Sequence, residues 1–204
     1  MSITLHYEDL PDDLDLGNIV AIDTEAMGLN PVRDRLCVVQ LSAGDGTTHL
    51  VHFRDGTFNA PNLVKLLEDP NVLKLFHFGR FDIAIMWAYL GALTAPVYCT
   101  KIASRMARTF TQHHGLSALC RDLLGVEMSK KMQTSYWGTD ELTPEQQEYA
   151  ASDVLYLHQL REKLNAMLDK EGRLELAEAC FDFLPHRAVL DIAGWSEEDI
   201  FAHH

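Results

Sequence analysis

The apolar positions in the first half of the chain fall into short runs that are typical of β-strands. Residues 19–25, 36–42 and 48–53 are rich in Val, Ile and Leu, and the segments between them carry Gly, Pro and Asp. Runs of this kind, bounded by turn residues, predict a strand in each case. We expect a fourth, buried strand over residues 72–78.

The remaining periodic segments indicate helices, which dominate the second half of the chain. The longest begins with a capping-box pattern, because Thr143 precedes Pro144 and Gln146 lies three residues after Thr143. Strands that alternate with helices, followed by a helical second half, predict an α/β fold with a mixed sheet flanked by helices. The helices are expected over residues 61–67, 82–90, 100–108, 116–124 and 144–169.

The chain is long enough, at 204 residues, for one domain with a complete core, and no internal segment has the composition of a linker. We expect this domain over residues 1–180. Residues 181–204 form an extension that is too apolar for a disordered terminus, since it contains Leu184, Ile192 and Trp195. We expect the extension to pack on the domain or on a neighbouring subunit.

Charge and composition argue against several classes of protein. The net charge of -13 argues against a protein that coats long nucleic acid, but not against a nuclease whose metal ions supply positive charge. No run approaches the roughly 18 apolar residues of a membrane span, and the N-terminus lacks a signal-peptide pattern. The cysteines form no C-x-x-C pair, so we expect buried free thiols in a cytoplasmic protein without a membrane partner.

One part of the chain is basic. Between Lys101 and Lys131, six lysines and arginines accompany only two acidic residues, Asp122 and Glu127. This stretch has two interpretations, a solvated helix face or a rim that contacts phosphates.

Acidic residues interrupt or follow several apolar runs, where an unpaired charge is costly. Asp23 and Glu25 lie two residues apart at a strand end, so their side chains share one face of the sheet. Asp82 begins an expected helix, and Tyr149 and Asp153 share one face of another because they lie four residues apart. Magnesium and manganese prefer carboxylate oxygens, so this set predicts a two-metal site.

Each part of this set also has an ordinary structural explanation. Asp23 and Glu25 fit a turn at a strand end, and Asp82 fits a favourable charge at a helix N-terminus. Tyr149 and Asp153 fit an amphipathic helix. The whole set, in this order, carries more weight than any part of it.

The order and context of these residues resemble the DEDD superfamily of 3′–5′ exonucleases, in the tyrosine-bearing (DEDDy) branch close to ribonuclease D. That resemblance implies a ribonuclease H-like exonuclease fold. Most of the chain is also similar to the short, single-domain nano-RNase C (NrnC) family of α-proteobacteria. The similar stretches are residues 22–41, 76–82, 99–103, 148–160 and 179–203.

The resemblance implies two divalent ions, Mg²⁺ or Mn²⁺, held by the four carboxylates. Asp23 would bridge both ions, while Glu25 and Asp153 would hold the ion that activates water. Asp82 would position the second ion through water. Tyr149 would orient the attacking water, since a tyrosine of pKa ~10 is a poor base at neutral pH. The products would be nucleoside 5′-monophosphates released from the 3′ end.

The resemblance also implies a substrate and an assembly. NrnC proteins are associated with very short RNA, dinucleotides above all, and with ring-shaped homo-oligomers such as octamers. Leu29, preceded by Met27 and Gly28, would wedge between two bases; alternatively, it anchors the turn before Pro31.

Two further residues are candidate substrate contacts with open alternatives. Trp137 either stacks on a base or fills the core under the long helix, and His77 is either a ligand or a strand-end histidine satisfied by backbone. The chain departs from many relatives at Phe78, where they carry a small residue or Asn, and at Tyr136, where they carry an acidic or polar residue. These departures leave the roles of both positions open.

Rival functions remain at this stage. A general 3′–5′ exonuclease acting on longer RNA or on DNA ends would need the same carboxylates. From other classes, a non-catalytic module that binds nucleic-acid ends and a metal-binding oligomer with acidic subunit contacts are the alternatives.

Overall fold

The computed structural model describes residues 2–129, 132 and 134–203. Lys130 and Lys131 of the basic stretch, and the final His204, lie outside the described residues. The described chain forms one six-stranded sheet with the order β1-β4-β3-β2-β5-β6. The strands are β1 (Ser2–Tyr7), β2 (Ile19–Ala26), β3 (Leu36–Ser42), β4 (Thr47–His52), β5 (Leu73–Phe76) and β6 (Val97–Cys99).

The sheet is mixed, as predicted. Strand β3 is antiparallel to both β2 and β4, whereas the β1–β4, β2–β5 and β5–β6 pairs are parallel. Strands β2, β5 and β6 therefore run in the same direction, and their C-terminal ends meet at one edge of the sheet. In parallel α/β sheets, ligands bind outside this edge.

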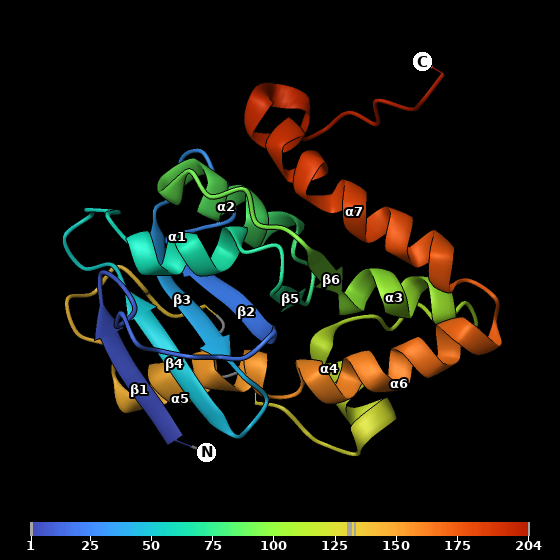
Figure 1. The fold of residues 1–204 in the computed structure, drawn as a ribbon, viewed down its shortest axis with the longest axis horizontal. Coiled ribbons are helices and arrows are strands. Elements are labelled where there is room, and N and C mark those ends of the chain that lie inside the picture. The colour runs from blue at the N-terminus through green and yellow to red at the C-terminus, as the bar shows by residue number, and fades with distance from the viewer. Residues whose placement is uncertain (1, 130–131, 133, 204) are drawn as a thin grey trace.

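Helices cover both faces of the sheet, with α1 and α2 on one side and α5 on the other (Figure 1). Helices α3, α6 and α7 lie together beyond the β6 edge (Figure 1). The helical elements, with π-helical turns marked η, are α1 (Pro61–Glu68), α2 (Arg80–Leu90), α3 (Thr100–Ala107), α4 (Leu116–Leu119), η1 (Cys120–Leu124), α5 (Pro144–Leu155), α6 (Leu157–Lys170), α7 (Leu174–Leu190) and η2 (Asp191–Trp195).

The two faces of the sheet pack into two hydrophobic clusters. The larger cluster joins the sheet to α1, α2 and the C-terminal helices. The smaller cluster lies between the sheet and α5 and contains Cys37, Val38, Leu50, Trp137, Leu142 and Ala150. Because β3 is covered on both faces, every one of its residues is buried, which explains its continuous apolar sequence.

The predicted strands are all present, and β3 has the predicted bounds. Two strands, β1 and β6, were not predicted. The expected helix over residues 116–124 is helix α4 followed by the π-helical turn η1. The expected long helix over residues 144–169 is interrupted at Tyr156, which separates α5 from α6.

The predicted capping box starts helix α5. The Thr143 hydroxyl accepts a hydrogen bond from the Gln146 amide at 3.2 Å, and the Gln146 side chain accepts one from the Thr143 amide at 3.0 Å. Both orphan donors of the first turn are thereby satisfied. This fixed start matters because α5 carries Tyr149 and Asp153.

Helix α7 crosses the position where the C-terminal extension was expected to begin. Its residues Phe181 and Leu184 are buried, and the Phe181 ring lies 4.5 Å from that of Tyr98. The boundary after residue 180 therefore falls within a helix that contributes to the core. Beyond α7, Asp191 accepts hydrogen bonds from Arg80 of α2 at 2.8 Å and from Arg187 at 2.7 Å.

The final residues have fewer contacts, among them one between the rings of Phe201 and Phe183 of α7, whose centroids lie 5.7 Å apart. The end of the chain extends away from the body of the molecule (Figure 1), and Ile200 and Phe201 are exposed.

Cys37, Cys99 and Cys120 are buried free thiols, as expected, but Cys180 is exposed because its side chain faces outward from α7. Among the described residues, no helix is long and apolar enough to cross a membrane.

Candidate active site

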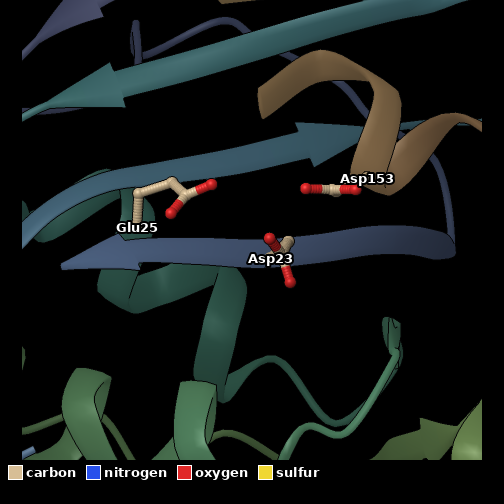
Figure 2. A group of neighbouring side chains, drawn as sticks. All are labelled: Asp23, Glu25 and Asp153. Atoms are coloured by element: carbon tan, nitrogen blue, oxygen red, sulfur yellow. The ribbon is translucent and has the colours of Figure 1, made fainter. Parts of the chain in front are cut away.

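Strand β2 and helix α5 bring three carboxyl groups together. Asp23 and Glu25 alternate with the buried Thr24 on β2, so both face α5, and Asp153 comes from that helix. Each of the three offers an oxygen within 4.8 Å of the other two. Figure 2 shows Glu25 and Asp153 with their carboxyl groups pointing toward each other, and Asp23 beside them on β2.

Asp82 is the fourth predicted carboxylate, and it is not part of this group of three. It lies in the first turn of α2, is 4% exposed and accepts a hydrogen bond of 2.6 Å from the Thr24 hydroxyl. Thr24 separates Asp23 from Glu25 along β2. Asp82 therefore holds the strand segment between the two ligand candidates, and its charge still acts on both.

Burial raises the pKa of all four carboxyl groups in this region, and repulsion from neighbouring carboxylates adds to this effect for Asp23, Glu25 and Asp82. Burial, followed by the charges of Asp82, Asp153 and Glu25, raises the pKa of Asp23 well above its ordinary range. Burial, followed by the charges of Asp153 and Asp82, raises the pKa of Glu25 to about 9. Burial raises the pKa values of Asp82 and Asp153 to about 7. Without a compensating cation, these groups are not all ionised at neutral pH.

The donor set fits a hard divalent cation. Asp23, Glu25 and Asp153 offer converging oxygens, which Mg²⁺ and Mn²⁺ prefer. A cation would also remove the repulsion that raises their pKa values. Asp23, Glu25 and Asp153 could therefore hold a metal ion directly, with Asp82 next to them.

Tyr149 lies one turn before Asp153 on α5. Its hydroxyl forms a hydrogen bond with the Asp153 carboxyl group, and this bond lowers the pKa of Asp153 against the larger effect of burial. Burial, together with the charges of Asp153, Glu25 and Asp23, raises the pKa of Tyr149 above its ordinary value. At neutral pH the hydroxyl stays protonated, so it can donate and orient but is a poor base.

The loop after β2 places Leu29 in solvent. Its side chain is 90% exposed, so it does not anchor the turn before Pro31. Asp34 stabilises that loop instead, because its carboxylate accepts a hydrogen bond from the Asn30 amide at 2.9 Å. A Cβ on Gly28 would lie 2.3 Å from the same carboxylate, so Gly28 is required for the loop to close.

Met27 and Tyr136 lie together beside this loop. Met27 is 42% exposed and Tyr136 is 66% exposed, and both approach Gly138 so closely that a Cβ there would meet the Met27 sulfur at 2.3 Å. The departure from relatives at Tyr136 thus puts an exposed aromatic ring next to Met27. Met27 and Leu29 are thus exposed apolar residues of the loop that leaves β2, and Tyr136, from the segment before α5, lies close to Met27.

Trp137 fills the core. It is 2% exposed in the cluster under α5, and its ring centroid lies 6.2 Å from that of Tyr149. Of the two roles considered for Trp137, its buried position supports packing beneath Tyr149. A fully covered ring has no free face for a base.

His77 is a strand-end histidine, but its partner is a side chain. Its Nδ1 lies 2.8 Å from the Thr100 hydroxyl, which itself donates to the Phe76 carbonyl. Burial, and then the charge of Lys101, lower the pKa of His77 to about 3, so the ring is neutral. The structure does not bring His77 into the group of three carboxylates.

A family model described as 3′–5′ exonuclease matches residues 6–169. The chain belongs to this 3′–5′ exonuclease family. Ribonuclease D of Acidiphilium cryptum is 36% identical over 166 residues, which cover 81% of this chain and 42% of that protein. The exonuclease chain thus spans about two fifths of the length of such ribonuclease D relatives.

Two solved structures match the whole exonuclease chain. Brucella melitensis NrnC bound to pGG is 54% identical with a TM-score of 0.96, and both chains are covered completely. Brucella melitensis NrnC with bound Mg²⁺ is 53% identical, again with a TM-score of 0.96 and complete coverage of both chains. The resemblance to the ribonuclease D-like exonucleases and to NrnC is therefore confirmed, as is the fold.

The basic stretch of the exonuclease divides into two groups. Arg108 and Arg121 form ion pairs with Asp122 at 2.6 and 3.1 Å, so these two arginines are structural. Lys101 and Arg105 instead line a cavity of about 510 Å³. Neither side chain forms an ion pair with another described residue. The remaining residues that line this cavity are Thr109, Thr111, Gln112, His114 and Gly115.

Two polar residues near the site were not predicted. Thr24, whose hydroxyl donates a hydrogen bond to Asp82, lies between Asp23 and Glu25 in the sequence. Gln40 on β3 pairs with Asp23 and is fully buried, and neither polar atom of its side chain has a partner among the described residues. The available signal for Gln40 was a polar residue within the apolar run of residues 36–42.

The raised pKa values predict how stability depends on pH and metal. A carboxyl group whose pKa is raised in the folded state contributes stability below about pH 4, and that contribution is lost as pH rises through about 7 to 9. In EDTA, we expect the melting temperature to fall between pH 5 and pH 9. Adding Mg²⁺ or Mn²⁺ should raise it more at pH 8 than at pH 5.5, because protons compete with the metal.

Asp153→Asn provides the internal check. Removing one negative charge should raise the melting temperature in EDTA at pH 8 by about 3–8 °C and should remove most of the metal effect. Glu162→Gln, an exposed carboxylate of α6, is the matched control and should behave as wild type. The melting temperatures are measured by calorimetry or circular dichroism. If Mg²⁺ or Mn²⁺ raises the melting temperature of the wild-type and Asp153→Asn proteins equally, the metal assignment is wrong.

Proposed function

We propose that this chain is a metal-dependent 3′–5′ exoribonuclease that releases nucleoside 5′-monophosphates from short RNA, including dinucleotides. The observation that carries the proposal is the convergence of Asp23, Glu25 and Asp153 on one group, with the Tyr149 hydroxyl beside it. Similarity along the full chain to an NrnC bound to pGG and to an NrnC with bound Mg²⁺ supports both the substrate and the cofactor.

In this proposal, two divalent ions, Mg²⁺ or Mn²⁺, bind at the carboxylates. When bound, such ions lower the pKa of water and stabilise charge on the attacking and leaving oxygens. Asp23, Glu25 and Asp153 would hold the ions, with Asp82 next to them. Burial and mutual repulsion make it costly to ionise these carboxyl groups without a cation, so binding of divalent ions is favourable.

The protein groups then have distinct roles. Tyr149, kept protonated by its surroundings, donates to Asp153 and orients the attacking water. Asp82 holds Thr24 and thereby keeps Asp23 and Glu25 on the face toward α5. Partial burial of Asp23, Glu25 and Asp153 between β2 and α5 reduces their contact with bulk water, which strengthens each of these electrostatic contacts.

Short RNA suits the surroundings of the site. The exposed side chains of Leu29, Met27 and Tyr136 offer apolar contacts that do not depend on base identity. The cavity lined by Lys101 and Arg105 offers positive charge for a phosphate within a protein of net charge -13. Both features serve a small substrate better than long strands.

A general exonuclease on longer RNA is the second candidate, because ribonuclease D relatives share 36% identity with this chain. DNA ends belong to the same alternative, since no described residue is assigned to the 2′-hydroxyl. A non-catalytic module would not need the complete set of four carboxylates and a tyrosine.

We also propose a cytoplasmic location, on the basis of three buried free thiols.

We further propose that the chain forms a homo-oligomer, such as an octameric ring, through its C-terminal end. Helix α7 and Asp191 are anchored to the domain, whereas Ile200 and Phe201 lie beyond the anchor and remain exposed. Apolar residues held outside the core in this way are suited to a subunit contact.

The length series is the direct test of the proposed function. RNA of two to ten nucleotides and matching DNA, each 5′-labelled, are supplied with Mg²⁺ or Mn²⁺, and initial rates are compared. We expect one-nucleotide steps from the 3′ end, with the highest rate on the dinucleotide. A flat profile would favour the general exonuclease, and no hydrolysis above that of Asp153→Asn would refute the proposal.

Arg105→Ala tests the basic cavity. Loss of a charge-assisted phosphate contact should raise KM about 10-fold at 50 mM salt with little change in kcat, and should weaken the salt dependence of KM. Arg121→Ala is the matched control, because Arg121 lies in the same basic stretch but pairs with Asp122. If both variants have the wild-type KM, the cavity has no role in binding.

Replacing Ile200 and Phe201 together by Ser tests the assembly. The anchor at Asp191 remains, so the fold should be unaffected while the oligomer dissociates into smaller species. Light scattering coupled to gel filtration measures the mass. Leu176→Ser, which alters an exposed apolar residue of α7, is the control. An unchanged mass in the double variant would rule out this contact.

A further inference from the structure

The edge where β2, β5 and β6 end brings three short segments side by side. In the β2–β5 pairing Ala21 lies opposite Leu75, so Asp23 is level with His77, the first residue after β5. In the β5–β6 pairing Phe76 lies opposite Cys99, so Phe78 and Lys101 follow neighbouring strand ends. Phe78 therefore emerges between the carboxylates on β2 and the basic residues of α3.

Phe78 has an unusual backbone conformation. Its φ of 66° is in the left-handed region, where the Cβ of residues other than Gly approaches the carbonyl oxygen. Such conformations are rare for bulky residues and persist chiefly at functional sites. A residue of this kind needs a compensating gain elsewhere in the fold or in function.

Packing does not supply that gain. Phe78 is 48% exposed and is not a member of either hydrophobic cluster of the described chain. Its ring contact is with Lys101, whose ammonium nitrogen lies 4.0 Å from the ring centroid. One face of the ring is therefore covered by a cation, yet about half of the residue remains open to solvent.

The Lys101 contact also links the ring to the basic cavity. Lys101 lines that cavity together with Arg105, one turn further along α3. A strand passing from the carboxylates toward the cavity would cross Phe78, with its phosphates near cations and its bases near the ring. Aromatic side chains beside a basic groove are typical of surfaces that bind single-stranded nucleic acid.

We propose that Phe78 is a substrate-contact residue that stacks on a nucleobase, held in place by its left-handed backbone and by Lys101. The inference rests on the proposed function, since it names a base-binding element of the same site. Stacking accepts any base, so Phe78 would add affinity without adding sequence preference.

Three variants separate the ring from the backbone strain. Phe78→Asn removes the ring and suits the left-handed conformation, so affinity should fall about 5- to 100-fold while the melting temperature rises by about 2–5 °C. Phe78→Leu should lose affinity without that gain in stability. Phe78→Trp should keep an affinity close to that of the wild-type protein. Affinity is measured by calorimetry with pGG in Ca²⁺, and hydrolysis is measured separately in Mg²⁺.

Tyr7→Leu is the matched control, because Tyr7 is another half-exposed ring with a cation over it. The Arg54 guanidinium carbon lies 3.7 Å from that ring centroid, but Tyr7 belongs to β1, the outer strand on the other side of the sheet from β6. This variant should bind pGG as tightly as wild type.

Substrates that lack one base complete the test. If Phe78 stacks on a base, removing that base weakens binding to wild type but has little further effect on Phe78→Asn. Coupling of this kind at either nucleotide position supports the inference, and equal losses in both proteins at both positions overturn it. Binding with coupling but no hydrolysis would refute the proposed function alone, whereas hydrolysis without coupling would refute the Phe78 role alone. A protein that neither binds nor hydrolyses would refute both.

Discussion

The repulsion among Asp23, Glu25, Asp82 and Asp153 is the constraint on which the rest of the structure depends. Four acidic side chains lie close together. Burial raises all four pKa values, and the charges of the neighbouring carboxylates raise those of Asp23, Glu25 and Asp82 further. Among the residues that the structure describes, no lysine or arginine forms an ion pair with these carboxylates, so other contacts must hold them in place. The fold supplies these contacts with β2 paired on both edges, with the capped helix α5, and with the Thr24–Asp82 hydrogen bond.

The pattern of apolar residues was sufficient to predict the central strands of the sheet, because the sequence of each of these strands shows that pattern by itself. Strand β3 is buried on both faces and is apolar throughout, so its bounds were predicted correctly. Strand β1 is an edge strand whose exposed positions dilute the pattern, and β6 has only three residues, too few for a period. The break at Tyr156 has no Gly or Pro to announce it.

For the candidate site, spacing along one element was informative and relations between elements were not. Spacing placed Asp23 with Glu25, and Tyr149 with Asp153, on shared faces. It could not separate Asp82 from the group, because the Thr24 contact joins residues 58 apart in the sequence. It also could not divide the basic stretch, since that division depends on which arginines reach Asp122 in the folded chain.

The distribution of charge and apolar surface around the site explains how an acidic protein can suit a polyanion. Carboxylates with raised pKa values favour divalent ions, and those ions would meet the phosphate under attack. In the proposed function, the exposed side chains of Leu29, Tyr136 and Phe78, which add little to the core, would contact the substrate. Bases supply the apolar surface that such side chains match. In the proposed function, affinity therefore depends on one or two nucleotides at the site rather than on a long track of phosphates.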